Sequence, residues 1–375
     1  MNEKEIAEIR RHYRYDRSNI TRICGCQVNK NGEIISEFDQ SIGLMSEEDA
    51  NGMLGLLKKA LSGHLGRNLL EIDFTTHQVN TSESYALISN LKASKLQDET
   101  LRAELYNKII ANFIIDSNYL IILGYDEFDV FDASSDAMES KESSSMHSYM
   151  ICAICPVKEG KVQMSYYSPA KCFRSVTSDA VVSRPEVGFV FPVIEDKQTN
   201  IYKALYYTKN LENNYSELVS ALFEKEAPMP AKIQTETFGD ILEETVGEEC
   251  SLRVVSSIHA QINEIIEESK NADVDSETPC VTKKDAGDML RFCGVSEEKV
   301  EAFEQSFEQN FGENASVSPE NLSRAKQMQI ETSEVTVKVN AGCTSVVETR
   351  VIDGVKYILI RADSGVVVNG VNVNI

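Results

Sequence analysis

The sequence predicts an α+β protein: a mixed β-sheet with helices, followed by an acidic helical region and a small C-terminal β meander. Three observations lead to this class. As far as about Pro230, short runs that alternate between apolar and polar residues are interspersed with apolar stripes of helical spacing. From there to about Met328 the pattern is helical and rich in acidic residues. Beyond it come short valine-rich runs separated by Asp-Gly and Asn-Gly pairs, which are typical of hairpin turns.

The length and the linkers suggest how the chain divides into domains. A chain of 375 residues exceeds the size at which one hydrophobic core keeps growing. The segment Pro228-Met229-Pro230 is typical of a linker, because proline ends regular structure. We therefore expect an α+β sheet domain over 1–230, an acidic helical region over 231–328 and a C-terminal β-hairpin module over 329–375.

The chain begins with a short helix and a β-hairpin. Residues Asn2–Arg14 place apolar side chains on one helical face. Two β-prone runs then flank Asn31-Gly32, the commonest filling of a tight type I′ turn, since both residues tolerate positive φ. The pattern predicts a hairpin with strands at Ile20–Val28 and Glu33–Phe38.

The rest of the first region mixes helices and strands. Ser46 is a good N-cap for an apolar stripe that ends at Gly63. Residues Tyr119–Leu123 form an uninterrupted apolar run, long enough for a central strand and too short for a helix. Asp132–Ser148 is rich in Ser, Asp and Glu, so we expect a mobile loop there. Further helices are expected at 82–91 and 98–114, and further strands at 68–76, 149–157, 161–167, 187–193 and 201–208.

The later part of the chain is first helical and then β-rich. Helices are predicted at 235–246, 251–270, 283–293 and 296–311. The last two have the spacing of a DNA-reading helix-turn-helix, but the second carries five glutamates against one lysine and would repel phosphate. After Glu334, the pairs Asp353-Gly354 and Asn369-Gly370 predict two turns of a β meander. Because a lone hairpin is marginally stable, we expect helices or a second subunit to cover its apolar face.

The net charge argues against some classes of partner. A formal charge of -22 opposes tight binding to nucleic acid, because phosphate contacts rely on clustered Lys and Arg. Between Glu236 and Arg324 there are 21 acidic and 7 basic residues, whereas residues 1–30 contain 7 basic and 4 acidic residues. Either this asymmetry steers a partner, or the acidic residues form solvated helix faces.

The sequence contains no predicted membrane segment. No apolar run reaches the ~18 residues needed to cross a bilayer, and the charged N-terminus lacks the apolar core of a signal peptide. We therefore expect a cytoplasmic protein that does not bind membranes. The nine cysteines, an odd number, fit reduced thiols better than a disulfide framework in that compartment.

An acidic stretch directly after the predicted central strand is a candidate metal site. It contains Asp126 and Asp129, and carboxylates at such strand ends hold Mg²⁺ in many phosphoryl-transfer enzymes. Glu71 and Asp73, on the polar face of an earlier predicted strand, are candidate further ligands. The four residues are candidate ligands of a divalent-metal site, but acidic strand ends and loops are very common, and we favour a solvated acidic rim. No other cofactor is expected.

Four cysteines near predicted strands are candidate zinc ligands: Cys24, Cys26, Cys152 and Cys155. Residues two apart in a strand share a face, so Cys24 and Cys26 can point the same way. Cys152 and Cys155 are three apart and face opposite ways. We therefore expect buried free thiols, and whether Cys26 and Cys155 do more than fill a core stays open.

A run of tyrosines and lysines from Tyr202 to Lys209 has two interpretations. Such interleaving occurs on surfaces where nucleic-acid bases stack. Tyrosines that line the core of a sheet explain the run at least as well, and we favour that interpretation.

Six stretches carry a family resemblance: Asn19–Ile23, Gly32–Asp39, Ile154–Lys158, Asn200–Asn210, Cys293–Val300 and Glu348–Leu359. Through them the chain resembles an uncharacterised bacterial family, domain of unknown function 4317. The resemblance covers nearly the whole chain and transfers no catalytic residue. Cys26, Asp126 and Asp129 fit the family pattern, whereas Cys24 and the segment Asp132–Ser148 depart from it.

The sequence brings no set of catalytic residues together, so its function has to be inferred from weaker features. The leading hypothesis is a non-catalytic cytoplasmic binding or scaffolding protein that self-associates into a homo-oligomer or binds a protein partner. The alternative is a metal-dependent enzyme that acts on a phosphate-bearing or nucleic-acid substrate. It would use Asp126 and Asp129 with Glu71 or Asp73.

Overall fold

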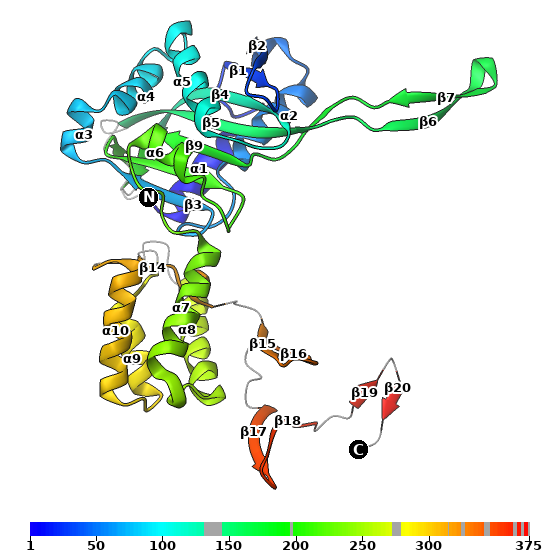
Figure 1. Cartoon of the computed structure of the whole chain (residues 1–375). Helices are drawn as coiled ribbons and strands as arrows, with labels where there is room; N and C mark the ends of the chain where they lie inside the picture. Colours follow the sequence, from blue (N-terminus) through cyan, green and yellow to red (C-terminus); the bar gives the residue numbers. More distant parts are fainter. Residues whose placement is uncertain are drawn as a thin grey trace, which may run out of the picture. The chain divides into compact units, whose positions relative to one another are not determined.

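The structure divides into two compact units, Met1–Pro230 and Ala231–Ile375. It is a computed structural model, shown in Figure 1. It describes residues 1–130, 145–195, 198–271, 279–313, 315–323, 327–340, 346–362, 366–368 and 371–373. Helices and strands occur in both units, which confirms the predicted α+β class.

The first unit is built on an eight-stranded sheet. The order of the strands across it is β2-β1-β4-β5-β9-β12-β3, and β8 pairs with the end of β5. Every pairing between these strands is antiparallel. The sheet is therefore purely antiparallel, whereas the sequence predicted a mixture of parallel and antiparallel strands. The strands are β1 Arg22–Val28, β2 Ile34–Ser41, β3 Leu69–Asp73, β4 Asn118–Val130, β5 Ser145–Lys158, β8 Val181–Val182, β9 Val187–Phe191 and β12 Lys203–Thr208.

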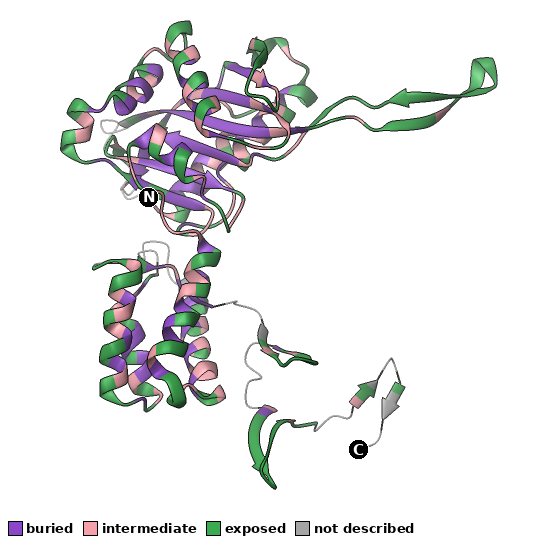
Figure 2. Ribbon diagram, viewed as in Figure 1, coloured by how far each residue is buried: buried purple, intermediate pink, exposed green. Residues whose placement is uncertain are grey.

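Helices cover both faces of this sheet. Because successive side chains of a strand point to opposite faces, β5 sends Cys152 and Ile154 into one core and Ile151 and Ala153 into the other. Both sets are buried, as Figure 2 shows for the strands of the sheet. Helices α4 Glu83–Ala93, α5 Glu99–Asn112 and α6 Ser216–Phe223 pack on the first face; α1 Glu3–His12 and α2 Glu47–Lys59 pack on the second. A short helix, α3 Thr76–Thr81, precedes α4.

The N-terminal hairpin forms as predicted, but its turn differs from type I′. Of the two predicted turn residues only Gly32 has a positive φ, 81°. The Gly32 amide donates to the Asn29 carbonyl at 3.0 Å, and the Asn29 amide donates to the Glu33 carbonyl at 2.9 Å. The register shifts between Gln27 and Val28, so the loop is longer than two residues. The side chain of Asn29, which accepts from the amides of Asn31 and Glu33, stabilises this alternative turn.

A second hairpin projects from the sheet as an arm (Figure 1). We use the name arm for β6 Val162–Tyr167, β7 Cys172–Thr177 and the turn between them. In the described residues the two strands pair only with each other. Eleven of their twelve residues are exposed, and Ser165 is half-buried. The arm is therefore exposed on both faces, as its colour in Figure 2 shows. The sequence predicted β6 but not β7, because β7 does not alternate cleanly between apolar and polar residues.

Two predicted segments of the first unit need correction. The last four residues of the predicted loop Asp132–Ser148 belong to strand β5, which begins at Ser145. The rest of the predicted loop lies outside the described residues. The predicted strand 187–193 is divided by Pro192 into β9 and β10, Val193–Glu195. Strand β10 turns away from the sheet and pairs with β11, Gln198–Asn200.

The second unit begins with a bundle of helices. They are α7 Ala231–Val246, α8 Leu252–Asn271, α9 Lys283–Phe292, α10 Glu297–Phe311 and the short α11 Pro319–Leu322. Their apolar stripes meet in one core that includes Phe238, Ile262 and Phe303. A two-residue pairing of β13 Val281–Thr282 with β14 Ser316–Val317 ties the ends of α9 and α10 together. Gly294 follows the C-cap Cys293 of α9 and has a φ of 83°, the left-handed conformation that commonly ends a helix.

Three separate hairpins follow the bundle. They pair β15 Gln327–Glu331 with β16 Thr336–Asn340, β17 Val347–Ile352 with β18 Val355–Ile360, and β19 Val366–Val368 with β20 Val371–Val373. The Asp353-Gly354 turn has positive φ at both residues, 51° and 80°, as a type I′ turn requires. Asn369-Gly370 lies outside the described residues, although the strands on either side pair as predicted.

Candidate functional site

Asp126 is the predicted site residue with the most unusual surroundings. It lies on β4, and its side chain is fully buried. One carboxylate oxygen accepts the Tyr149 hydroxyl at 2.9 Å, and the other accepts the Glu127 amide at 2.9 Å. No Lys or Arg pairs with it in the described part of the chain, and His12 Nδ1 lies 3.9 Å from its Oδ2. Asp126 is therefore a buried carboxylate held by hydrogen bonds rather than by a cation.

The pairing of β4 with β5 assembles most of this cluster. Asp126 lies opposite Tyr149, and Phe128 lies opposite His147. Because residues two apart share a face, all four side chains point to the side of the sheet that α1 covers. Tyr13, just after α1, then brings its hydroxyl to 3.1 Å from that of Tyr149. Since the single Tyr149 proton is given to Asp126, Tyr13 is the donor in that second bond.

Two histidines border the cluster. The His147 ring stacks on Tyr149 at 5.4 Å, and its Nδ1 lies 2.8 Å from the Thr199 hydroxyl of β11. The His12 ring meets the Phe128 ring edge to face at 4.1 Å. His12 Nδ1 and His147 Nε2 are buried without a hydrogen-bond partner in the described residues. Each therefore keeps one ring nitrogen that nothing in this part of the structure satisfies.

Burial sets the protonation states of the cluster. It raises the pKa of Asp126 to about 6, although the Tyr149 and Glu127 hydrogen bonds oppose the shift. Burial lowers the pKa of His147 to about 3 and also lowers the pKa of His12. It raises the pKa values of Tyr13 and Tyr149. At neutral pH the cluster therefore contains one anionic carboxylate among neutral phenols and imidazoles.

This arrangement can bind and release a proton, but a substrate has no access to its carboxylate. The Asp126 side chain is completely enclosed, and Tyr13 and Tyr149 are buried as well. Acid–base catalysis requires the group to reach the proton it transfers within hydrogen-bond distance. The geometry accordingly fits a buried polar network better than an active site.

The other predicted metal ligands do not meet Asp126. Asp129 lies further along β4 with an exposed side chain. Glu71 and Asp73 lie on β3, at the edge of the sheet, where Glu71 pairs with the Met1 amino group at 2.7 Å and both lie near Lys203. Three strands separate β3 from β4, which corresponds to about 19 Å. In the described residues no three His, Cys, Asp or Glu side chains are placed to hold a metal ion, so the predicted four-carboxylate site does not form.

The cysteines divide between the two cores. Cys24, Cys26 and Cys152 lie in the core under α4–α6, and Cys155 lies in the core under α1 and α2. Cys152 and Cys155 therefore point to opposite faces of β5, as predicted for two residues three apart in a strand. All four are free and buried, and burial raises the pKa of Cys26 and of Cys155 to about 12. Cys26 and Cys155 therefore behave as thiols of two different hydrophobic cores.

Comparison with known proteins gives one result. A family described as domain of unknown function (DUF4317) matches residues 1–371. The chain belongs to the DUF4317 family. No curated protein and no solved structure matches this DUF4317 chain. No helix in the described residues of the DUF4317 chain is long and apolar enough to cross a membrane.

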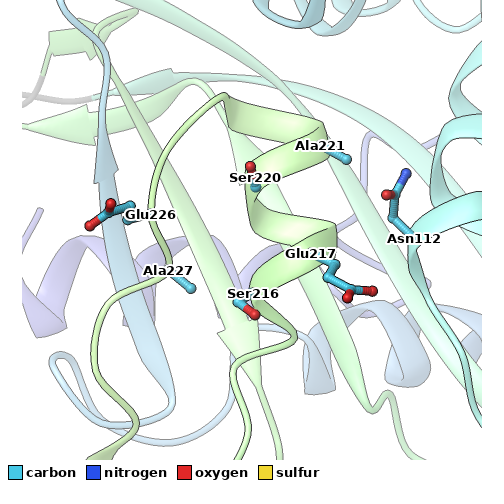
Figure 3. A pocket seen from close by; sticks show the side chains of 7 residues that line it. All are labelled: Asn112, Ser216, Glu217, Ser220, Ala221, Glu226 and Ala227. Carbon is cyan, nitrogen blue, oxygen red and sulfur yellow. The ribbon is translucent and has the colours of Figure 1, made fainter.

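A surface groove of this DUF4317 chain lies between α5 and α6. Its volume is about 570 Å³, and Figure 3 shows its lining. The lining side chains are small or acidic: Asn112, Ser216, Glu217, Ser220, Ala221, Glu226 and Ala227. They include no histidine, lysine or cysteine that could activate either serine. The groove therefore has no such base beside its serines, and the ionisable groups of its lining are Glu217 and Glu226.

Sequence patterns alone could not identify the partners of Asp126 in the DUF4317 chain. Tyr13 lies 136 residues before Tyr149 in the chain, and the two meet only because α1 packs on the sheet. The histidines show no metal-binding spacing, so no local signal marks His12 or His147. In the tyrosine-rich run, Tyr206 and Tyr207 are buried in the two cores of the sheet, whereas Tyr202, just before β12, is 42% exposed.

Proposed function

We propose that this protein is a non-catalytic binding or scaffolding protein that self-associates through the arm. A protein that self-associates needs an exposed apolar surface whose burial in the oligomer lowers the free energy. The arm supplies such a surface, whereas the Asp126 carboxylate is enclosed and the groove lining has no histidine, lysine or cysteine beside its serines.

The single observation that carries the proposal is the exposure of apolar side chains on the arm. Val162 and Met164 are each 70% exposed and Phe173 is 72% exposed. Proteins that remain monomeric seldom leave such residues side by side on an extended element. Exposed contiguous apolar surface of this kind is typical of a protein–protein interface.

These side chains share one face of the arm. The pairing of Tyr166 with Phe173 and of Met164 with Ser175 fixes the register. Because side chains alternate along each strand, Val162, Met164, Tyr166 and Phe173 all point to the same side. The Tyr166 and Phe173 rings also lie 5.2 Å apart. We call this set of four the apolar arm face.

An isolated hairpin such as the arm needs a partner surface to be stable. Two strands without a packed face are marginal in water. The arm makes no strand pairing beyond its own two strands in the described residues. A second copy of the chain would cover the apolar arm face in every molecule at once.

The cell compartment and the partner classes complete the proposal. We infer a bacterial cytoplasm, where the eight described cysteines, all free, would stay reduced. A protein partner or a second copy fits better than nucleic acid, because the net charge is -22. Membrane binding is not part of the proposal.

Sedimentation equilibrium of the full chain tests this proposal. The combined variant Met164→Ser, Tyr166→Ser, Phe173→Ser keeps the fold, because all three side chains are exposed. We expect the wild type to form a dimer or higher oligomer and the variant to be a monomer at the same concentration.

A matched control replaces three apolar side chains that are exposed elsewhere on the first unit, Met146→Ser, Ile201→Ser and Tyr202→Ser. This control should assemble like the wild type. A wild type that stays monomeric at every concentration, or a control that dissociates like the arm variant, would overturn the proposal.

A further inference from the structure

The edge strand β2 offers open hydrogen-bonding groups and a charge opposite to that of the arm. It pairs with β1 on one side, and no strand pairs with its other side in the described residues. Nearly every side chain of β2 is exposed. An edge of this kind presents free backbone N–H and C=O groups to which another strand can add.

We infer that the arm of one copy adds to the β2 edge of a second copy and extends its sheet. This inference rests on the proposed self-association and names the surface that receives the arm. The arm has the same open groups as β2, because β6 and β7 also pair on one side only in the described structure. Addition of strand to strand would satisfy both sets.

Charge complementarity selects β2 as the receiving surface. Residues 162–177 of the arm contain Lys171 and Arg174 and no acidic residue. Residues 33–41, which include β2, contain Glu33, Glu37 and Asp39 and no basic residue. Asp39 is already paired with Arg22 and Arg102, so Glu37 is the acidic side chain of β2 that has no ion pair in the described structure. Opposite charges on neighbouring strands stabilise their pairing, whereas two arms paired with each other would bring like charges together.

The alternation of side chains makes this pairing consistent on both faces of the sheet. Glu37 and Asp39 lie on the face of β2 that continues the core under α4–α6, because Glu37 lies opposite Cys26, whereas Phe38 lies on the other face. The register shift next to Val28 places Ile34 opposite that residue, on the face of Glu37. If β7 adds with Arg174 on the Glu37 face, then Phe173 falls on the face of Phe38, and the apolar arm face lies on the same side of the extended sheet as Phe38. A shift of the pairing by one residue would instead place Arg174 on the face of Phe38 and Phe173 on the face of Glu37.

The β2 edge also exposes apolar side chains that an added strand would cover. Ile35 is 53% exposed, and Leu44, three residues after β2, is 89% exposed. Reciprocal exchange of two arms doubles the buried area, which suits the two-fold symmetry of most homodimers. It also brings the contact closer to the ~1,200 Å² that a stable dimer needs.

Charge reversal at one pair of residues tests the assignment. Glu37 is exposed and has no ion pair in the described structure, and the Arg174 guanidinium contacts only the Tyr167 ring there, at 4.3 Å. We expect Glu37→Lys and Arg174→Glu each to weaken dimerisation by roughly tenfold, since each turns an attraction into a repulsion in both halves of the dimer. The double variant should recover most of the affinity, because the pair is restored with its signs exchanged.

The control is Glu217→Lys, which makes the same change in charge on α6, where the side chain is also exposed. Its dimerisation should match that of the wild type. Hydrogen exchange gives a direct second measurement: the β2 amides should exchange more slowly in the dimer than in the monomeric variant of the apolar arm face.

The outcomes separate this inference from the proposed function. A monomeric wild type removes both. The wild type could instead dimerise through the apolar arm face while Glu37→Lys and Glu217→Lys dimerise with equal affinity and the β2 amides exchange at the rate of the monomer. That result would leave self-association standing and overturn the β2 assignment.

Discussion

Asp126 is a residue whose environment opposes its charge. A carboxylate without a cation in a hydrophobic core is retained only because hydrogen bonds hold it. Tyr149 and the Glu127 amide supply these bonds, and the raised pKa shows that they do not fully compensate for burial. The folded protein therefore binds the Asp126 proton more tightly than the unfolded chain does.

The first prediction concerns the stability of Asp126→Asn. The pKa of Asp126 is about 6 in the folded state against an ordinary value of 3.8, so its contribution to stability is greatest below pH 3.8 and is lost as the pH rises through about 6. Asn resembles the protonated acid and carries no charge to desolvate. At pH 8 we expect the variant to be more stable than the wild type by up to about 3 kcal/mol. Urea unfolding at several pH values measures the difference.

The matched control for this prediction is Asp129→Asn on the same strand, where the carboxylate is exposed. Its stability should follow that of the wild type at every pH. The prediction would be contradicted if the difference in the free energy of unfolding between Asp126→Asn and the wild type were the same at pH 4 and pH 8.

The sequence identified Asp126 but not the residues around it. The uninterrupted apolar run Tyr119–Leu123 is enough to mark Asp126 as an acidic residue beside a central strand, although β4 continues to Val130 and Asp126 lies within it rather than after its end. Its contacts depend on which strands are neighbours, and period-two patterns give the face of a residue but not the order of the strands. For the same reason Glu71 and Asp73 seemed close to Asp126, whereas three strands lie between them.

At the scale of elements, local turn chemistry predicted some features and misled on others. Asp353-Gly354 forms the expected turn, with positive φ at both residues. At Asn31-Gly32 the Asn29 side chain binds two amides and stabilises a longer loop. The sequence does not predict β7, since a strand that is exposed on both faces has no need of the alternation that marks a half-buried strand.

The second prediction concerns the contact between β1 and β4. Gly25 lies opposite Ile122 in this pairing, and a Cβ at position 25 would lie 2.0 Å from the backbone oxygen of Ile121. Because backbone atoms of a central strand cannot move aside, Gly25→Ala should destabilise the first unit by about 3 kcal/mol. Its melting temperature should fall by about 6 to 12 °C, as measured by calorimetry.

Gly52→Ala is the control for Gly25→Ala. Gly52 lies within α2, and a Cβ there meets nothing within 4 Å. Alanine is the better helix former, so this variant should gain up to about 1 kcal/mol. If both variants melted like the wild type, the close approach of β1 and β4 would be refuted.

At the scale of the whole molecule, the first unit depends on its N-terminal elements. Helix α1 contributes Ile6 and Ile9 to the core, and β1 contributes Ile23 and Val28, all fully buried. Burying each such side chain is worth about 1.5 to 3 kcal/mol, so the four together contribute about 6 to 12 kcal/mol. That sum is comparable with the entire stability of a typical domain, about 5 to 15 kcal/mol.

The third prediction follows from this comparison. Removal of residues 1–39 should abolish the cooperative unfolding transition of the first unit, because β4 loses its neighbour and one core loses its cover. Calorimetry of the full and the shortened chain would show whether the transition is lost.

Removal of residues 329–375 serves as the control for this deletion, since these residues belong to the second unit. The transition of the first unit should then remain at its usual temperature. A cooperative transition at the wild-type temperature in the chain without residues 1–39 would contradict the prediction.

The place of β3 in the sheet has a consequence for synthesis on the ribosome. In the described structure β3 pairs with β12 alone, and Leu69 lies opposite Tyr207, 138 residues later in the chain. At about 5 to 20 residues per second, translation needs roughly 7 to 28 s to deliver that partner. During this interval the nascent chain carries an unpaired apolar strand, so the growing protein offers chaperones a binding site that the finished protein no longer has.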